Sequence, residues 1–347
     1  MSRIIQKDKP VEVTVFCLTY NHEKYIERML ESVVGQKTNF NYEVLVHDDA
    51  SVDNTKAIIE KYANLYDVIV PIYQKKNQYS LNRKITYDIL LPLAKGRYFA
   101  FCEGDDYWCD EYKLQKQYDT LERNSNCSLC VHKVACCNED GSYNSRVIPE
   151  SFYNLKEGEI DREEIADCLW LRGGYPFQTS SYFVRREVYS DEENFKFMYK
   201  FSLDQSIIQA GMRSGDFYYY EDIMSCYRMG SAGSWNKMFE TNGIQNRITH
   251  WKKHVIERGI VYDALTNFRF HQKIEYAIVQ NILSWCIYDQ EEAKNIFREI
   301  DFDLNNRNEY ITYIMKIRFW MLFHFPFLLK YVQITVKSMK NALKQKF

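Results

Sequence analysis

Three carboxylates crowd around one glycine in the stretch Glu103-Gly104-Asp105-Asp106, directly after the apolar run from Tyr98 to Cys102. The apolar run predicts a buried strand, so these acids stand at a strand end. Carboxylates packed this densely repel one another and resist burial unless a cation lies among them. Hard oxygen ligands suit Mg²⁺ or Mn²⁺. We therefore expect a divalent cation here, with an acidic turn before an aromatic anchor as the structural alternative.

Two further predicted strands, residues 11–19 and 42–47, also end in polar side chains. Both strands are apolar and rich in β-branched residues, which is typical of strands buried on both faces. The polar residues that follow them are Tyr20, Asn21, Asp48 and Asp49.

The first half of the chain alternates strands with helices. Strands are predicted at 11–19, 42–47, 68–73 and 98–102, and helices at 26–34, 58–65 and 80–94, where apolar residues recur at three- and four-residue spacing. This order predicts an α/β fold with a doubly wound, mostly parallel sheet and helices on both faces. Ligands of such sheets bind beyond the carboxyl ends of the strands, where the polar clusters meet. The chain contains no Gly-x-Gly-x-x-Gly and no Walker loop, which argues against a dinucleotide cradle.

The second half predicts a helix over 110–123, a strand over 127–137 and a helix that opens at 161–164. A strand over 177–184, a short helix over 202–211 and strands over 217–220 and 224–228 follow. Beyond Trp235 the pattern is helical. We therefore expect an α/β domain over 1–235 that carries the site, and a helical C-terminal region over 236–347.

The composition limits the class of protein. A net charge of −2 over 347 residues argues against nucleic acid as a partner. The ten cysteines form no framework and residues 1–10 are charged and polar, which favours free thiols in a reducing cytoplasm. Cys127, Cys130 and His132 have a spacing that suggests zinc, but on a strand Cys127 faces the other side, so we do not expect zinc.

Taken in order, these pieces resemble the family 2 glycosyltransferases with the GT-A fold, and in particular those of bacterial surface-polysaccharide assembly. The resemblance covers about residues 10 to 235. It rests on the strand that runs into Tyr20-Asn21, on Asp48-Asp49-Ala50-Ser51-x-Asp53, on Ala94-Lys-Gly-Arg-Tyr98 leading into Glu103-Gly-Asp-Asp-Tyr-Trp108, and on Lys113-Leu-Gln-Lys-Gln117.

The resemblance implies a site for a nucleoside diphosphate sugar. Tyr20, with Asn21 beside it, would lie next to the base, and either Asp48 or Asp49 would hydrogen-bond the base or the ribose. Arg83 or Lys84 stands where the family often has a basic residue near the donor.

The same resemblance implies a metal motif, Glu103-Gly104-Asp105, with Asp106 after it. Asp105 and Asp106 would be ligands of Mn²⁺ or Mg²⁺ or of its waters. Glutamate in the first position departs from the commonest pattern, although its longer side chain could still reach the ribose. Arg228 lies in the loop that often closes over the donor, but Met229 and Gly230 stand where many relatives carry a histidine.

The family's catalytic base is an acid on a short helix beside the acceptor, and Asp204, seven residues before Gly211, matches that position. The base removes the proton of the attacking hydroxyl, while a divalent cation offsets charge on the leaving diphosphate. An ordinary helix N-cap is the structural alternative for Asp204. Thr179 and Ser180 fall where the family's sheet meets the acceptor.

The implied activity is that of an inverting, metal-dependent glycosyltransferase of the hexosyltransferase type, with a UDP-sugar as the family's commonest donor and a glycan or lipid-linked glycan as acceptor. A transferase acting on polyprenyl phosphate, and a non-catalytic glycan- or nucleotide-binding protein, are the alternatives. The apolar run 319–329 and the lysines after it suit a peripheral contact of residues 316–347 with the inner face of the cell membrane, or else packing on the core.

Overall fold

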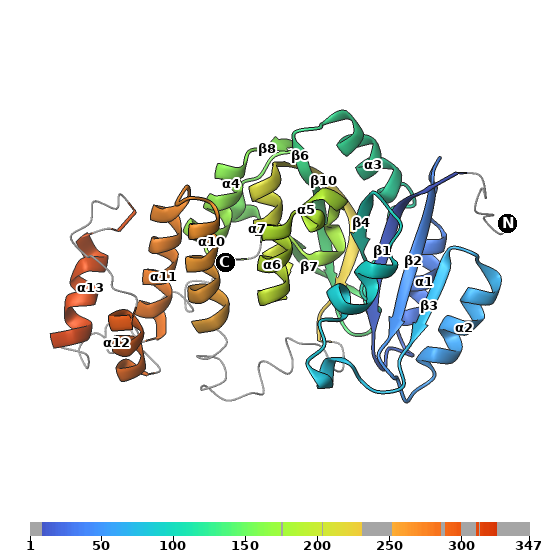
Figure 1. Ribbon diagram of the computed structural model, residues 1–347, viewed down its shortest axis with the longest axis horizontal. Coiled ribbons are helices and arrows are strands. Elements are labelled where there is room, and N and C mark those ends of the chain that lie inside the picture. Colours follow the sequence, from blue (N-terminus) through green and yellow to red (C-terminus); the bar gives the residue numbers. More distant parts are fainter. Residues whose placement is uncertain are drawn as a thin grey trace. The chain divides into compact units, whose positions relative to one another are not determined.

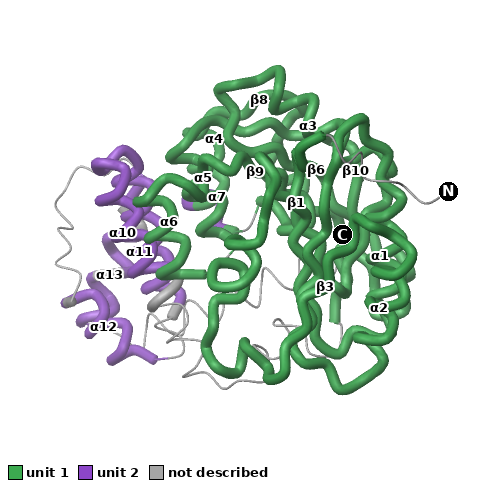
Figure 2. Tube along the Cα trace, turned by 45° about the vertical axis from the view of Figure 1, so that its right-hand side comes forward, with its two compact units in different colours: residues 1–169, 174–240 green, residues 170–173, 241–347 purple. Residues whose placement is uncertain are grey.

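The computed structural model describes residues 9–174, 176–202, 204–230, 252–285, 289–299, 310–311 and 313–324. The chain divides into two compact units (Figure 2): residues 1–169 with 174–240, and residues 170–173 with 241–347.

The described residues of the first unit build a ten-stranded sheet (Figure 1). Its strands are β1 (Val11–Thr19), β2 (Asn41–Asp48), β3 (Ile69–Tyr73), β4 (Tyr98–Phe101), β5 (Tyr107–Trp108), β6 (Cys127–Cys137), β7 (Tyr143–Ile148), β8 (Gly158–Ile160), β9 (Phe183–Arg185) and β10 (Asp216–Arg228). The order is β3-β2-β1-β4-β9-β6-β10-β5, with β7 beside β6 and β8 beside β10. β1 to β4, β6 and β10 run in one direction, and β9 runs against its neighbours β4 and β6.

The register of the parallel strands brings their polar ends together. Thr19 pairs with Asp48, and Asp48 pairs with Tyr73. The Gly104 N–H donates to the Leu18 carbonyl over 2.9 Å, which carries the pairing of β1 and β4 into the acidic stretch. The predicted meeting of strand ends at one edge is therefore confirmed.

Helices cover both faces of this sheet, because the strands are apolar on both sides. On one face lie α1 (Ile26–Val34), α2 (Thr55–Leu65) and α3 (Lys113–Arg123), whose apolar residues join the main core cluster. The described helices α4 (Arg162–Ala166), α5 (Arg186–Ser190), α6 (Glu192–Phe201) and α7 (Asp204–Ser214) pack together on the other. Gly211 permits close packing of α7, since a Cβ there would lie 2.2 Å from Leu129 on β6. The predicted α/β fold with helices on both faces is confirmed, and the sheet is mixed, since β5, β7, β8 and β9 run antiparallel to their neighbours.

Some element predictions were wrong. The helix predicted over 80–94 is not continuous: it is divided into three short helical segments, Tyr79–Leu81, Thr86–Leu90 and Leu91–Leu93, because Asn82 takes a left-handed conformation and Pro92 cannot continue a helix. Within the strand predicted over 177–184, Thr179–Ser181 form a short turn, and the strand β9 begins only at Phe183. The two strands predicted at 217–220 and 224–228 are one strand, β10, with register shifts between Tyr220 and Ser225.

The second unit is helical where it is described. Its α-helices there are α10 (Arg258–Leu265), α11 (His271–Trp285), α12 (Gln290–Glu299) and α13 (Tyr313–His324). Trp170, Tyr262 and Phe270 pack ring against ring in its core, with Trp170 5.5 Å from Phe270. No helix within the described ranges has the length and apolar character needed to cross a membrane. Of the predicted membrane segment 316–347, residues 325–347 lie outside the described residues.

Candidate active site

The loops after β1 and β2 are tied to each other by hydrogen bonds. Asn21 takes a positive φ of 54°, its N–H donates to Ser51 Oγ over 2.9 Å, and its side-chain oxygen accepts from the Val52 N–H over 2.9 Å. These bonds leave Tyr20 at the surface with 42% of its area exposed. Asn21 thus fastens the loop, and the exposed ring of Tyr20 is available to a ligand.

Asp48 and Asp49 are both buried, but they have different partners. Asp49 accepts from the backbone N–H groups of Gln78, at 2.6 Å, and Tyr79, at 3.0 Å, and so uses both oxygens to hold the turn Tyr79–Leu81. Asp48 accepts only through Oδ1, from the N–H and hydroxyl of Ser51. Within the described residues, Asp48 Oδ2 accepts no hydrogen bond, which makes Asp48 the better placed of the two for recognition of a ligand.

The acidic stretch holds three electrostatically coupled carboxyl groups. Asp106 is 2% exposed, and its carboxylate accepts from the Arg228 N–H over 2.9 Å and from Gln178 Nε2 over 3.1 Å. Burial and the neighbouring Asp105 raise the pKa of Asp106 well above its usual range. Burial, Asp204 and Asp105 raise the pKa of Glu103 in the same way. Ionising these carboxyl groups together is therefore unfavourable unless a cation lies among them.

Gly104 lets the acidic stretch lie against β1. A Cβ on Gly104 would lie 2.6 Å from Thr19 Oγ1 and 2.7 Å from His22 Nδ1, closer than any real contact. Both of those atoms are buried and have no hydrogen-bond partner among the described residues. Burial lowers the pKa of His22, and the nearby carboxylates of Asp105 and Asp53 oppose that shift.

Asp204 begins α7 and faces the acidic stretch. The Thr179 hydroxyl donates to Asp204 Oδ2 over 2.5 Å. Asp204 is an exposed residue, yet enough protein surrounds its carboxylate to raise its pKa, while the bond from Thr179 opposes that shift. The effect of Asp204 on the pKa of Glu103 shows that the two carboxyl groups lie near each other.

The basic residues expected at the site lie differently. Arg83 is half exposed and pairs with Asp88, with Nε 3.2 Å from Oδ2, while Lys84 lies 4.0 Å from the centre of the Tyr199 ring. Arg228 is only 4% exposed. Its guanidinium donates to the backbone carbonyls of Asp105, Asn138 and Glu139 at 2.9, 3.3 and 2.8 Å, so the structure uses it inside the protein.

The charge of these acids suits a divalent cation. Two of them have raised pKa values from burial and mutual repulsion, which a cation would relieve. Asp105 and Asp106 would hold the cation, Asp105 as the more exposed of the two. Both Asp106 oxygens already accept hydrogen bonds, which fits contact through a metal-bound water. In the described part of the chain no three His, Cys, Asp or Glu side chains form a complete metal-binding group.

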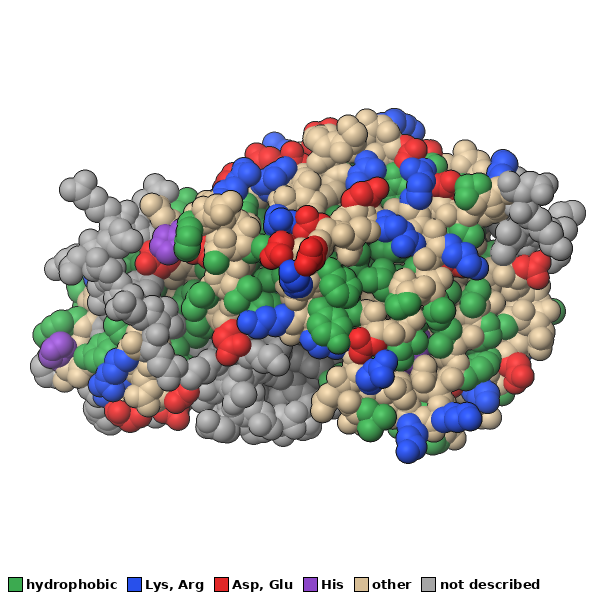
Figure 3. Space-filling view, viewed as in Figure 1, with side chains coloured by type: hydrophobic (Ala, Val, Ile, Leu, Met, Phe, Trp, Pro, Cys, Tyr) green, Lys and Arg blue, Asp and Glu red, His purple; other side chains and the backbone are tan. Residues whose placement is uncertain are grey.

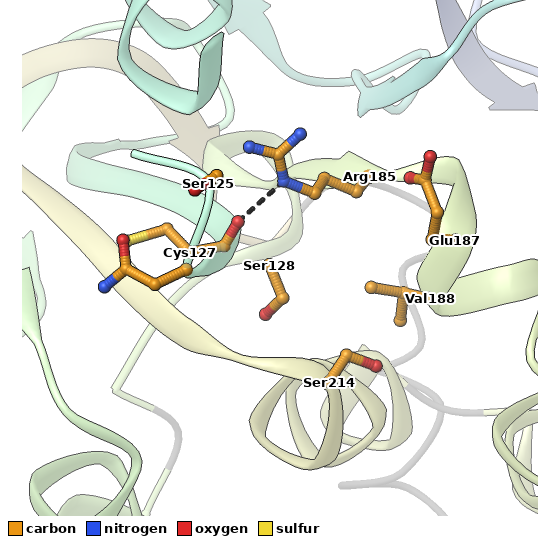
Figure 4. A pocket seen from close by; sticks show the side chains of 8 residues that line it. Ser125, Cys127, Ser128, Arg185, Glu187, Val188 and Ser214 are labelled. Carbon is orange, nitrogen blue, oxygen red and sulfur yellow. Dashed lines mark hydrogen bonds between the residues drawn. The ribbon is translucent and has the colours of Figure 1, made fainter. Parts of the chain in front are cut away.

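A cavity of about 320 Å³ lies at the opposite edge of the sheet (Figure 4). Cys127 at the start of β6 and Arg185 at the end of β9 line it, and Arg185 Nε donates to the Cys127 carbonyl over 2.7 Å. These positions are at the far ends of their strands from the acids. The cavity is therefore separate from the candidate active site.

Sequence reasoning missed Gln178. Its partner Asp106 lies 72 positions earlier, so no local pattern could have linked them. Thr179 was expected near the acceptor, but its bond to Asp204 was not anticipated.

Comparison with solved structures finds a protein with a similar fold. S. aureus TarS, residues 1–349 in complex with UDP-GlcNAc, has a TM-score of 0.53 and 17% sequence identity, and the match covers 78% of this chain and 81% of that one. At this identity the likeness shows the fold alone.

Comparison with family models and curated proteins goes further. The model described as glycosyl transferase family 2 matches residues 14–205, more than half of the chain. This chain therefore belongs to glycosyl transferase family 2.

Among its relatives, an uncharacterized protein of Mycobacterium tuberculosis is 28% identical over 79% of this chain and 74% of its own length. The Bacillus subtilis protein named as a teichuronic acid biosynthesis glycosyltransferase, TuaG, is 31% identical over 46% of this chain and 61% of its own. The abequosyltransferase RfbV of Salmonella typhimurium is 27% identical over 50% of this chain and 52% of its own.

Proposed function

We propose that this protein is an inverting, metal-dependent glycosyltransferase that moves a sugar, of the hexose type, from a nucleoside diphosphate sugar to a glycan or lipid-linked glycan in bacterial polysaccharide biosynthesis. One observation carries the proposal. The acids Glu103, Asp105 and Asp106 after β4 are electrostatically coupled with one another, and Glu103 is also coupled with Asp204 on α7. In this arrangement, a group of carboxylates that can bind a cation lies next to Asp204, a carboxylate that can act as a base.

The donor site is formed by the loops after β1, β2 and β3. The exposed Tyr20 ring offers a face for the base, and Asp48 Oδ2 offers an acceptor for a ribose or base donor. The Tyr73 hydroxyl is buried without a partner in the described part of the chain and is electrostatically coupled to Asp48. Asn21, Asp49, Arg83, Glu103 and Arg228 complete the set of donor-site residues, of which Asn21, Asp49 and Arg228 act by holding loops in place.

A divalent cation, Mn²⁺ or Mg²⁺, bound by Asp105 and Asp106 would offset charge on the leaving diphosphate. Asp204 takes the proton of the acceptor hydroxyl as that oxygen attacks the anomeric carbon. Thr179 occupies Asp204 Oδ2, and Oδ1 accepts no hydrogen bond from the described residues. Oδ1 is thus the oxygen that meets the acceptor. A single displacement by this route inverts the anomeric centre.

The names of relatives support the substrate class. One relative is the Escherichia coli protein named UDP-Glc:alpha-D-GlcNAc-diphosphoundecaprenol beta-1,3-glucosyltransferase WfaP, which is 34% identical over 32% of this chain. Its name favours a UDP-sugar as the donor and a lipid-linked acceptor. TuaG, named for teichuronic acid biosynthesis, favours a cell-surface polymer. Action at a lipid-linked acceptor suits a cytoplasmic protein with a peripheral membrane contact through residues 316–347.

The surface is consistent with a substrate other than nucleic acid. On the face shown in Figure 3, acidic and basic side chains are interspersed among the described residues, in keeping with a net charge of −2.

Calorimetric titration with UDP, GDP and CDP, each with and without Mn²⁺, tests the proposal. We expect one nucleotide, UDP, to bind with a clear requirement for Mn²⁺. Asp105→Asn should remove that requirement and weaken binding, while Asp119→Asn, the same charge change on α3, should not. Failure of every nucleotide to bind the wild-type protein would refute the donor site and favour a glycan-binding protein without transferase activity.

A further inference from the structure

Two consecutive residues, Gln178 and Thr179, each bond one of the two key acids. Gln178 Nε2 donates to Asp106 over 3.1 Å, and the Thr179 hydroxyl donates to Asp204 over 2.5 Å. Asp106 belongs to the stretch after β4 and Asp204 to the start of α7, so these two acids are almost a hundred positions apart in the chain. We refer to residues 178–181 as the bridging turn.

The bridging turn is rigid by construction. Gln178 Oε1 accepts from the N–H of Ser180 at 2.6 Å and from its hydroxyl, and the Gln178 carbonyl accepts from the N–H of Ser181 at 2.9 Å. Because the Ser180 N–H can only donate, the Gln178 amide oxygen must face it, and the amide N–H₂ must face Asp106. The Ser180 hydroxyl also contacts Ser225 on β10 at 2.8 Å.

A buried polar chain anchors the bridging turn to α3. Gln117 Nε2 donates to the Ser181 carbonyl over 2.9 Å, and Lys113 Nζ donates to Gln117 Oε1 over 2.7 Å. Gln117, Lys113 and Ser181 are each 0% exposed. Buried hydrogen bonds of this kind hold one arrangement firmly, since a rotation of Gln117 would leave buried polar groups unpaired.

We propose that the bridging turn sets the separation of the metal-side carboxylate of Asp106 from the base Asp204, and that Gln178 and Thr179 are positioning residues for sugar transfer. The proposal rests on the function proposed above. Gln178 presents Asp106 to the cation side, and Thr179 occupies one oxygen of Asp204 so that the other meets the acceptor. The segment Lys113-Leu-Gln-Lys-Gln117 after the acids thus has a structural role: its Gln117 and Lys113 anchor the bridging turn.

Thr179→Val and Thr179→Ser test the bond to the base. Valine keeps the shape without the hydroxyl, and serine keeps the hydroxyl. With the UDP-sugar that the wild-type protein cleaves, Thr179→Val should lower kcat about tenfold with KM for the donor unchanged, because a displaced catalytic group loses rate before binding. Thr179→Ser should restore most of the rate. Thr120→Val is the matched control, since Thr120 is also a buried threonine whose hydroxyl bonds one side chain, that of Tyr220.

A double-mutant cycle separates positioning from a structural role. In an Asp204→Asn background, Thr179→Val should change the residual rate by less than about twofold, since the group it positions is gone. An equal loss in both backgrounds, or a Thr179→Ser rate as low as that of valine, would overturn the assignment of Thr179.

Gln178→Met tests the other arm in the same way. It should weaken Mn²⁺-dependent UDP binding about tenfold, and lose that effect in an Asp106→Asn background. Gln36→Met, at another buried glutamine that bonds the Asp110 carbonyl, is the control and should leave Mn²⁺-dependent binding unchanged. A Gln178→Met protein with wild-type Mn²⁺-dependent binding would overturn the assignment of Gln178.

Crystal structures of Thr179→Val and Gln178→Met keep the two proposals apart. If the wild-type protein cleaves no nucleotide sugar and binds no nucleotide, the proposed function fails, and the positions of the two carboxylates then decide the inference. Rotation or displacement of Asp204 in the first variant and of Asp106 in the second supports the bridging turn. Carboxylates superimposable on the wild-type positions in both variants refute it.

Discussion

Arg228 donates its backbone N–H to the Asp106 carboxylate over 2.9 Å, at the end of β10. The guanidinium of the same residue donates to the Asp105 carbonyl over 2.9 Å, so one residue holds both aspartates of the acidic stretch. Its ring contact with Tyr25, 4.7 Å from the guanidinium carbon to the ring centre, ties the arrangement to the segment that leads into α1. The acidic stretch is therefore fixed from the far end of the sheet's longest strand.

Arg228→Met should cost stability and loosen the acids. Three backbone carbonyls would lose their donor in a buried place, which costs about 2–4 kcal/mol. Arg97→Met is the control: Arg97 is half exposed and pairs with Glu12, and its loss should cost about 1 kcal/mol or less. Chemical denaturation measures both. Equal losses for the two variants would contradict the bracing role of Arg228.

Asp204→Asn should lower turnover about 100-fold or more with little change in donor affinity, because a general base contributes to the transition state and not to donor binding. Asp67→Asn, an exposed aspartate between α2 and β3, should leave turnover unchanged. Initial-rate kinetics with the UDP-sugar that the wild-type protein cleaves measure both. An Asp204→Asn protein with wild-type turnover would remove Asp204 as the base.

The pH dependence of turnover should reflect the surroundings of Asp204. Burial raises its pKa, the Thr179 hydroxyl opposes the shift, and the groups that face it are Glu103, Tyr87 and Tyr189. A base works only when deprotonated, so kcat falls as pH falls through that pKa. The fall should begin at a higher pH than for an ordinary aspartate, and a kcat profile that stays flat down to pH 4 would contradict this.

Gly104→Ala should disable the site. The added Cβ would meet Thr19 Oγ1 at 2.6 Å and His22 Nδ1 at 2.7 Å, so the acidic stretch must move away from β1. Overpacking of this kind costs about 1–3 kcal/mol, and Mn²⁺-dependent nucleotide binding should fall with it. Gly35→Ala, at the end of α1, meets only the Glu31 carbonyl at 3.0 Å and Ser32 beyond it, and should leave nucleotide binding unchanged. Wild-type binding by Gly104→Ala would show that the contact is not needed.

Lys113 should make stability depend on pH in the alkaline range. Burial lowers its pKa from 10.5 to about 7, with Cys102 and Cys130 opposing the shift. Between pH 7 and 10.5 the unfolded chain then binds the proton that the folded protein lacks, so Lys113 makes stability rise with pH across this range. The buried thiols of Cys102 and Cys130 have raised pKa values and act in the opposite direction in wild type and variant alike.

The difference between wild type and Lys113→Met isolates this contribution. The free energy of unfolding is measured by urea denaturation at pH 7 and pH 9. Its change from pH 7 to pH 9 should be more positive, that is, more stabilising, in the wild type than in Lys113→Met. The same change in both proteins would mean that the folded protein keeps Lys113 charged.

The parts of the fold that the sequence predicts are those with local causes. Apolar runs that end in polar or acidic residues mark β1, β2 and β4, and their parallel register follows from the alternation with helices. Cys127–Cys137 forms a strand with the predicted bounds, because no glycine or proline interrupts its alternating pattern.

What depends on distant partners could not be predicted. The sequence around Phe177 to Val184 reads as a strand, yet the chain turns there because the Gln178 side chain accepts from the Ser180 N–H and donates to Asp106. Arg228 is placed in the correct region but faces inward, since its acceptors are carbonyls from two other loops. Leu65 has the spacing of a buried position, but α2 ends there and leaves it 57% exposed.

The reversed direction of β9 affects which segments bring side chains to the edge of the sheet where the acidic stretch lies. In a wholly parallel sheet, only segments that follow a strand reach the ligand edge, and those that precede a strand serve the other edge. Because β9 runs against β4 and β6, the residues just before it arrive where its neighbours end. One inverted strand thus brings an extra segment, the bridging turn, to the candidate active site without a longer loop. A designer could use the same inversion to add a side chain to an existing α/β site.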